Sequence, residues 1–216
     1  ASMELQTNSS NNTVYADSDG NIAYYHGNFV PVRDTSFDWN SPLDGSDPAT
    51  EWQGLHPVDE IINLLNPPNG WIQNTNNWPF TAAGEYSPRV EDYPSYMANN
   101  SENPRGIHAV RVLKDRSDFT IDKLIEAAYD PTLTAFEDLI PALLVTSAAD
   151  QQDELPASIQ SQTLEYIDLL RGWNYKYSLD STATTLAVYW GQILMNEVSA
   201  DAAAAGINIY EYMANN

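Results

Sequence analysis

The spacing of apolar and polar positions changes character near residue 104. Upstream, short apolar runs alternate with Asn, Pro and Gly, a pattern typical of strands and ordered loops. Downstream, apolar residues recur every three or four positions, which indicates amphipathic helices. The sequence therefore predicts an α+β protein with a strand and loop part over residues 1–103 and a largely helical part over residues 104–216.

The first part predicts a β-hairpin followed by a long loop. In "NTVYADSDGNIAYYH", the turn signal Asp19-Gly20 separates two runs with strand composition, residues 13–15 and 22–25. Turn-forming Pro and Gly recur throughout residues 29–54, which favours an ordered loop over regular structure.

Further elements follow from proline positions and periodicity. In "PVDEIINLLNPP", Pro57 comes early and Pro67 follows a run of apolar residues, so we expect a short helix, then a strand at "GWIQNT", residues 70–75. A capping-box pair, Thr134 and Glu137, marks the start of a later helix. The predicted helices of the second part cover 107–114, 121–129, a segment from 134 that contains Pro141, a segment from 156, and 186–198.

Composition and charge exclude several classes of protein. With 216 residues, 43% of them hydrophobic, the chain can bury a substantial core. Thirty acidic against nine basic residues give a net charge of −21, which repels nucleic acid and anionic membrane surfaces. The sequence contains neither a membrane-spanning apolar run nor a signal peptide.

Common catalytic constellations are also missing. The absence of cysteine removes disulfides, thiolate zinc sites and cysteine nucleophiles. The three histidines show no metal-ligand spacing, and no nucleophile elbow, P-loop or dinucleotide-binding glycine motif is present. Acidic residues among Trp39 and Trp52 leave open a carbohydrate-binding or glycoside-cleaving module, in which carboxylates flank the bond and aromatic rings hold the sugar. A non-catalytic interaction domain is a second alternative.

The stretch "NPPNGWIQNTNNWPF", residues 66–80, contains five asparagines. Most asparagines between prolines and tryptophans bridge turns, because the amide hydrogen-bonds nearby backbone. A side-chain amide held on a rigid segment can also donate to the negative oxygen that develops during acyl transfer. The sequence alone leaves both interpretations open.

Three segments, in this order and spacing, resemble the β-chain of the penicillin-acylase-like N-terminal-nucleophile hydrolases. They are "NTVYADSDGNIAYYHGNFVPVR", "EWQGLHPVDEIINLLNPPNGWIQNTNNWPF" and "SENPRGIHAVRVL", and the similarity extends over about residues 5–145. The family includes penicillin, acyl-homoserine-lactone and lipopeptide acylases. The resemblance implies part of a mixed Ntn-hydrolase sheet, followed by helices.

The resemblance also implies roles for two residues. The family's oxyanion-hole asparagine, the first of an Asn-Asn pair, corresponds to Asn76. A family arginine that orients this asparagine and the N-terminal amine corresponds to Arg105, for which a surface ion pair with Glu102 is the alternative. The family nucleophile is a serine at the start of the β-chain, and Ser2 does not match its context, so we expect no nucleophile within this chain.

The expected function is therefore that of an acylase fragment, inactive alone, whose parent hydrolyses a linear amide in antibiotic biosynthesis or quorum quenching. Expected partners are the α-chain, the N-terminal part of the β-chain and a small acylated amide, in a periplasmic or secreted location. We expect no cofactor in the fragment. The parent could bind calcium, for which Trp39 and Glu85 are weak candidate contributors.

Overall fold

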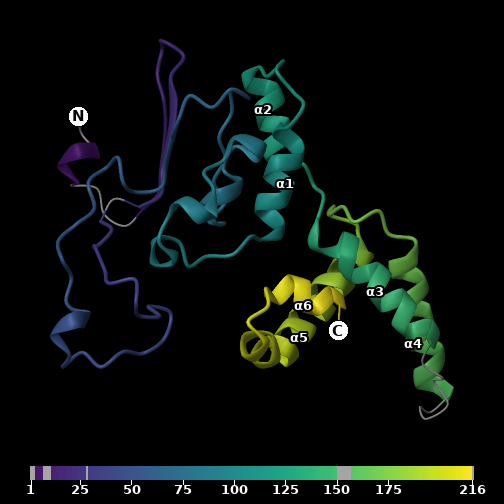
Figure 1. Ribbon diagram of the computed structural model, residues 1–216. Helices are drawn as coiled ribbons and strands as arrows, with labels where there is room; N and C mark the ends of the chain where they lie inside the picture. The colour runs from purple at the N-terminus through teal and green to yellow at the C-terminus, as the bar shows by residue number, and fades with distance from the viewer. Residues whose placement is uncertain (1–2, 7–10, 28, 150–156, 216) are drawn as a thin grey trace. The chain divides into compact units, whose positions relative to one another are not determined.

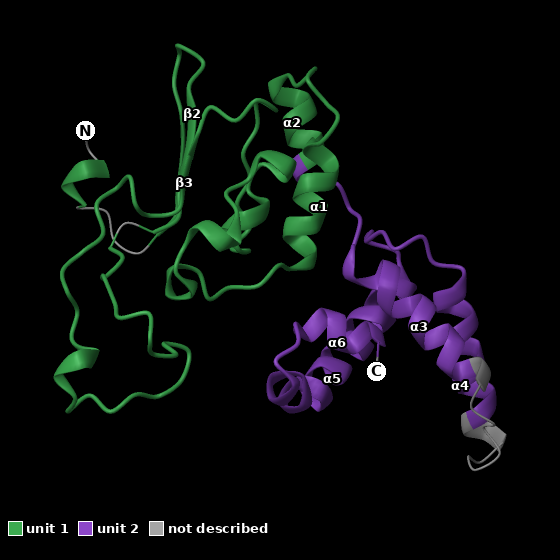
Figure 2. Cartoon of the chain, in the orientation of Figure 1, with its two compact units in different colours: residues 1–127 green, residues 128–216 purple. Residues whose placement is uncertain are grey.

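The computed structural model describes residues 3–6, 11–27, 29–149 and 157–215 (Figure 1). The chain forms two compact units, Ala1–Ala127 and Ala128–Asn216 (Figure 2). The compositional change at residue 104 lies inside the first unit, since two helices downstream of it belong to that unit.

Unit 1 contains a three-stranded antiparallel sheet in the order β1-β2-β3. The strands are β1 (Thr13–Ala16), β2 (Ile22–Tyr25) and β3 (Asn63–Leu65). Tyr24 of the central strand faces Val14 on one side and Leu64 on the other, and it is fully buried. The predicted hairpin is confirmed.

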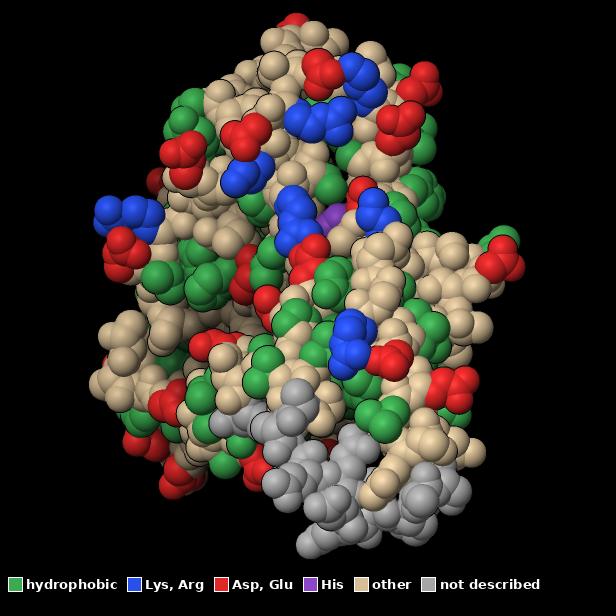
Figure 3. Space-filling model, turned by 90° about the vertical axis from the view of Figure 1, so that its right-hand side faces the viewer, with side chains coloured by type: hydrophobic (Ala, Val, Ile, Leu, Met, Phe, Trp, Pro, Cys, Tyr) green, Lys and Arg blue, Asp and Glu red, His purple; other side chains and the backbone are tan. Residues whose placement is uncertain are grey.

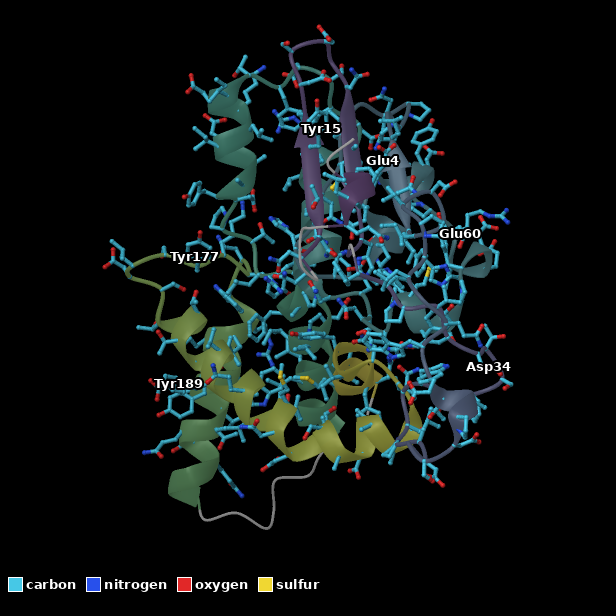
Figure 4. The ribbon with its side chains drawn as sticks, turned by 90° about the vertical axis from the view of Figure 1, so that its left-hand side faces the viewer. Glu4, Tyr15, Asp34, Glu60, Tyr177 and Tyr189 are labelled. Atoms are coloured by element: carbon cyan, nitrogen blue, oxygen red, sulfur yellow. The ribbon has the colours of Figure 1, made fainter. Side chains whose placement is uncertain are left out.

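The hairpin turn is closed by one carboxylate. The Asn21 side-chain N–H donates to Asp17 Oδ2 at 2.9 Å, and the backbone N–H groups of Asn21 (2.9 Å) and Asp19 (3.0 Å) donate to Oδ1. These bonds favour the charged form and lower the pKa of Asp17. Gly20 takes the left-handed conformation that the turn requires, with φ +87°. Tyr15 of β1, labelled in Figure 4, adds a bond from its hydroxyl to Asp17 Oδ2.

Asparagine side chains connect this hairpin to later segments. Asn66 Oδ1 accepts from the Ile22 N–H at 2.8 Å, and Asn66 Nδ2 donates to Asn21 Oδ1 at 2.9 Å. Asn12 Nδ2 donates to Asn74 Oδ1 at 3.2 Å. Amide groups therefore join segments about 45 to 60 residues apart in the chain.

The predicted helix at residues 57–66 is wrong. A turn, with the Glu60 N–H bonded to the Pro57 carbonyl, leads instead into β3. Ile61 and Ile62 are both buried, and the residues after them obtain their backbone hydrogen bonds from β2. Such a short helix is marginal in water, so pairing with the sheet decides the outcome.

The predicted strand at residues 70–75 is also wrong, because this segment is extended but belongs to no sheet. The Gln73 N–H donates to the Ala82 carbonyl at 2.8 Å, and the Gln73 and Asn69 side chains donate to the Thr81 and Ala83 carbonyls. Its partners lie in a run of short 3₁₀ helices: η3 (Pro79–Thr81), η4 (Gly84–Tyr86), η5 (Val90–Asp92) and η6 (Ser95–Met97).

The long loop predicted over residues 29–54 is observed, interrupted by η2 (Pro48–Thr50) and by an isolated antiparallel bridge between Pro31 and Leu55. Its ends are joined where the Val32 N–H donates to the Gly54 carbonyl at 3.0 Å. Within the loop, the Arg33 guanidinium lies 4.8 Å from the centre of the Trp39 ring, a cation–π contact.

Unit 1 also contains α1 (Pro104–Leu113) and α2 (Ile121–Ala128), both predicted (Figure 1). A short 3₁₀ helix, η1 (Met3–Leu5), lies near its beginning. At the start of α1, the Asn103 side chain accepts from the Gly106 N–H at 3.0 Å, and Pro104 occupies the first turn.

Unit 2 is helical, with α3 (Ala135–Ala149), α4 (Ala157–Arg171), α5 (Thr182–Ala205) and α6 (Ile209–Asn215). The helices predicted from 134 and over 186–198 are confirmed, and Pro141 lies inside α3. The expected start of α4 at Pro156 lies outside the described residues, and α6 was not predicted. Unit 2 has its own core, which contains Phe136, Leu139, Ile140, Leu170, Trp173, Ala183, Ala187 and Met213.

These elements confirm the α+β class with a hairpin, long loops and a helical C-terminal part. The strand pairs of the described residues are antiparallel, whereas the family resemblance implied part of a mixed sheet. In the space-filling view, acidic side chains are scattered over the surface rather than gathered in one block (Figure 3). Over the residues that the structure describes, no helix is both long enough and apolar enough to cross a bilayer.

Candidate functional site

The turn that contains Asn76 packs against the beginning of α1. The Trp78 N–H donates to the Ser101 carbonyl at 3.3 Å, and Asn77 Nδ2 donates to Glu102 Oε1 at 3.0 Å. The α-carbon of Gly106 comes so close to this turn that an added Cβ would lie 2.4 Å from Asn77 Nδ2. Two segments about 25 residues apart in the chain thus form one substructure.

Asn76 lies exposed in this turn and has a left-handed backbone, with φ +61°. Non-glycine residues seldom adopt this conformation, and asparagine is among the few enriched in it. A side chain with an amide can therefore occupy this position at lower conformational cost than most other residues.

Asn77 is fully buried, in contrast to the exposed Asn76. Its Oδ1 accepts from both the backbone N–H and the hydroxyl of Thr75, each at 3.2 Å. Its Nδ2 donates to Thr81 Oγ1 at 2.9 Å as well as to Glu102. This amide uses its acceptor and both donor hydrogens, so it joins the residue before Asn76 to two later segments.

Glu102 receives donors from three directions. Besides Asn77, the Asn103 N–H donates to Oε1 at 2.8 Å and Thr81 Oγ1 donates to Oε2 at 2.5 Å. A carboxylate next to the first turn of α1 also interacts favourably with the positive end of the helix dipole. Glu102 therefore links the Asn76 turn to the residue that caps α1.

Arg105 occupies the first turn of α1 and is exposed. Its neighbour Gly106 lies close to both Asn77 and Glu102, since an added Cβ there would come within 2.4 Å of each side chain. The structure thus places Asn76 and Arg105 on two segments that touch each other. Among the described residues, Arg105 makes no ion pair with Glu102, so the alternative role considered for this arginine is not observed.

Sequence reasoning identified Asn76 and Arg105 but missed the residues that bring their segments together: Asn77, Thr81, Glu102 and Gly106. One signal for Gly106 was present, because a glycine inside a helix costs stability unless close packing requires it. Nothing in the sequence pattern indicates that Glu102 bonds to residues 77 and 81, since that contact depends on the path of the intervening chain.

The two weak candidates for a calcium site lie in different settings. Trp39 Nε1 donates to the Asp34 carbonyl at 2.7 Å in the long loop, and Glu85 is exposed in η4. Within the described residues, no group of three or more His, Asp or Glu side chains is arranged to hold a metal ion. Calcium requires six to eight oxygen ligands, so the described side chains do not fit such a site on their own.

Two histidines join loops in unit 1. His56 is buried, with Nδ1 2.8 Å from Glu60 Oε2 and Nε2 2.8 Å from the Tyr96 hydroxyl, which connects the long loop to η6. His26 Nδ1 lies 2.8 Å from the Tyr24 hydroxyl, and burial lowers the pKa of His26. Both ring nitrogens of His56 are thus engaged in contacts that hold the fold together, and His26 packs beside Tyr24 of β2.

The tryptophans that a sugar site would use do not form a common platform. Trp52 is 61% exposed, whereas Trp39 and Trp78 are only partly accessible. Trp78 packs edge to face against Phe80, with ring centres 5.4 Å apart. A carbohydrate-binding groove needs flat, open rings, so this arrangement does not favour it.

Comparisons with known proteins are consistent with one another. The sequence profile of the family described as penicillin amidase matches residues 1–215. The penicillin G acylase of Escherichia coli is 38% identical over 68 residues, which cover 32% of this chain and 8% of that protein. A solved structure, a thermostable penicillin G acylase from Alcaligenes faecalis in an orthorhombic form, aligns with a TM-score of 0.52 and 24% identity. This alignment covers 78% of the present chain and 28% of the solved one, and it shows a similarity of fold.

Proposed function

Since this chain belongs to the penicillin amidase family, we propose that it forms part of an amidohydrolase that cleaves a linear amide by acyl transfer. Its substrate class is an amide that carries a removable acyl group, such as a penicillin, an acyl-homoserine lactone or a lipopeptide. The nucleophile is an N-terminal serine supplied by a segment outside these 216 residues. The alignments cover only 8% and 28% of the two acylases, which supports a nucleophile that lies on another segment of the enzyme.

In this proposal Asn76 donates its side-chain N–H to the substrate oxygen. When the serine hydroxyl adds to the amide carbonyl, the carbonyl oxygen becomes negative, and a fixed donor stabilises that charge. The amine then leaves with a proton, and water releases the acyl group from the serine. The exposed position of Asn76 in a turn anchored by Asn77 is the observation that carries the proposal.

Arg105 completes the site by orienting groups rather than by reacting. Its guanidinium offers donors in a rigid planar fork, suited to holding an amide or backbone carbonyl oxygen. It extends from the first turn of α1, on the segment that packs against the Asn76 turn. We propose that it holds the Asn76 carbonyl oxygen, so that the amide N–H faces the substrate.

The expected partners are the α-chain and the N-terminal part of the β-chain, in a periplasmic or secreted enzyme. The 216-residue chain alone is then inactive, since the covalent route needs the serine. Because the described side chains do not fit a calcium site on their own, no catalytic step is assigned to a metal.

Kinetics of the complete enzyme that contains this chain test the proposal. Asn76→Ala should lower kcat about 10²- to 10³-fold, the usual loss for one oxyanion-hole donor, with a much smaller change in KM. Asn100→Ala, an exposed asparagine outside this turn, serves as the matched control. A kcat for Asn76→Ala within about twofold of wild type would exclude the oxyanion role, and amide cleavage by the isolated chain would contradict its predicted inactivity.

A further inference from the structure

The bonds around Asn77 form a closed ring. Asn77 Nδ2 donates both to Thr81 Oγ1 and to Glu102 Oε1, while Thr81 Oγ1 donates to Glu102 Oε2. Each of the three side chains therefore contacts the other two. A ring of this kind resists distortion, because moving any one member strains two hydrogen bonds at once.

This ring lies directly beside Asn76 in the chain. The side-chain oxygen of Asn77 accepts hydrogen bonds from the N–H and the hydroxyl of Thr75. These bonds connect the residues immediately before and after Asn76. The backbone of Asn76 is thereby held in its left-handed conformation by a neighbour that is itself fully buried.

The same ring reaches the beginning of α1. Glu102 Oε1 accepts from the Asn103 N–H, and Asn103 in turn caps the helix by accepting from the Gly106 N–H. Arg105 lies between these two residues on the same turn of the helix. Direct hydrogen bonds thus connect Thr75 to Asn77, Asn77 to Glu102, Glu102 to Asn103 and Asn103 to Gly106. A displacement of the Asn76 turn is therefore transmitted to the first turn of α1.

We propose that Asn77 and Glu102 are positioning residues for acyl transfer, which hold the Asn76 turn against the first turn of α1. The inference rests on the proposed function, in which Asn76 and Arg105 act together. Neither Asn77 nor Glu102 touches the substrate. They determine whether the Asn76 amide stands at the correct distance from the developing oxyanion, where an error of about 1 Å costs on the order of 10²-fold in rate.

Glutamate at position 102 has one feature that a test can use. Among its described bonds, two N–H donors reach Oε1 and the Thr81 hydroxyl reaches Oε2. Glutamine keeps an oxygen for the two N–H groups and presents NH₂ to Thr81 Oγ1, which can accept instead of donate. Alanine leaves all three donors without this acceptor. Glu102→Gln should therefore rescue what Glu102→Ala loses.

A double-mutant cycle in the complete enzyme tests the inference. Glu102→Ala should lower kcat about 10- to 100-fold with KM within about threefold, and Glu102→Gln should keep kcat within about fivefold. In the Asn76→Ala background, Glu102→Ala should change kcat by less than about twofold, because the group it positions is already gone. Active sites are counted with a covalent acylating titrant, and Glu126→Ala, an exposed glutamate of α2, is the control.

The outcomes separate this inference from the proposed function. If Asn76→Ala lowers kcat but Glu102→Ala does not, or if the two effects multiply in the double variant, the positioning role is refuted and the oxyanion role stands. If Asn76→Ala has no effect, both are refuted. Should Glu102→Ala not fold, Thr81→Val removes one hydroxyl of the ring, and a three- to tenfold lower kcat that disappears in the Asn76→Ala background is then required.

Discussion

One methyl group added at Gly106 would test how closely the Asn76 turn packs on α1. The Cβ of an alanine at this position would lie 2.2 Å from Glu102 Oε1 and 2.4 Å from Asn77 Nδ2. Ordinary contact begins at 3.4 Å, so either these two side chains or the turn itself must move by about 1.2 Å. Gly106 is buried, and both atoms belong to side chains that are held in place: Asn77 is fully buried, and Glu102 accepts hydrogen bonds from Asn77, Thr81 and Asn103.

The net cost combines three contributions. Overpacking a well-packed site costs about 1–3 kcal/mol. Breaking the hydrogen bond from Asn77 to the Glu102 carboxylate costs about 1.5–3 kcal/mol more, while replacing glycine by alanine in a helix returns up to about 1 kcal/mol. We therefore expect Gly106→Ala to lower the free energy of unfolding by roughly 3 kcal/mol, a large fraction of the 5–15 kcal/mol typical of a domain.

Urea unfolding of the 216-residue chain, followed by tryptophan fluorescence, measures this loss. Gly45→Ala is the matched control, since Gly45 is exposed, has no atom within 4 Å of an added Cβ and does not require positive φ. Its stability should stay within about 0.5 kcal/mol of wild type. A Gly106→Ala chain that loses less than about 1 kcal/mol would refute the close packing of the Asn76 turn on α1.

Two further predictions concern other parts of the chain. In unit 2, Ile140→Ala should lower the free energy of unfolding in urea by about 2–5 kcal/mol, because Ile140 is fully buried. Val145→Ala, at a side chain that is 72% exposed, should change this free energy little. Equal losses in the two variants would contradict the assigned core. In unit 1, burial lowers the pKa of His26 beside Tyr24, so the unfolded chain binds the proton more readily, and stability should fall as pH drops below about 6.5. The urea midpoint measured at pH 7.5 and 5.5 should drop less in His26→Gln than in wild type, and equal drops would exclude His26 as a cause.

Local signals were sufficient where the local sequence determines the structure. The Asp19-Gly20 hairpin and the helices predicted from residue 134 and over residues 186–198 formed as predicted, since turn chemistry and helical periodicity act over a few residues. The segments 57–66 and 70–75 were predicted wrongly because their hydrogen-bond partners, β2 and the residues after Pro79, lie elsewhere in the chain.

In the candidate site too, some residues could be identified from the sequence and others could not. Asn76 and Arg105 were found through family resemblance, and their catalytic roles stay predictions. The contacts that hold their segments together, from Asn77 and Thr81 to Glu102, join residues 21 to 25 positions apart. No periodicity or short motif encodes such a contact, because it depends on how the chain returns through four short 3₁₀ helices.

The amide cross-links of unit 1 bear on how the protein responds to ionic strength. The bonds that join Asn12 to Asn74 and Asn66 to Asn21 link neutral groups, so dissolved salt does not screen them. The repulsion that opposes folding of a chain with net charge −21 is, by contrast, weakened by counterions. A fold that joins its loops through asparagine therefore retains these cross-links while its self-repulsion declines, so we expect its stability to rise as the surrounding solution becomes more saline.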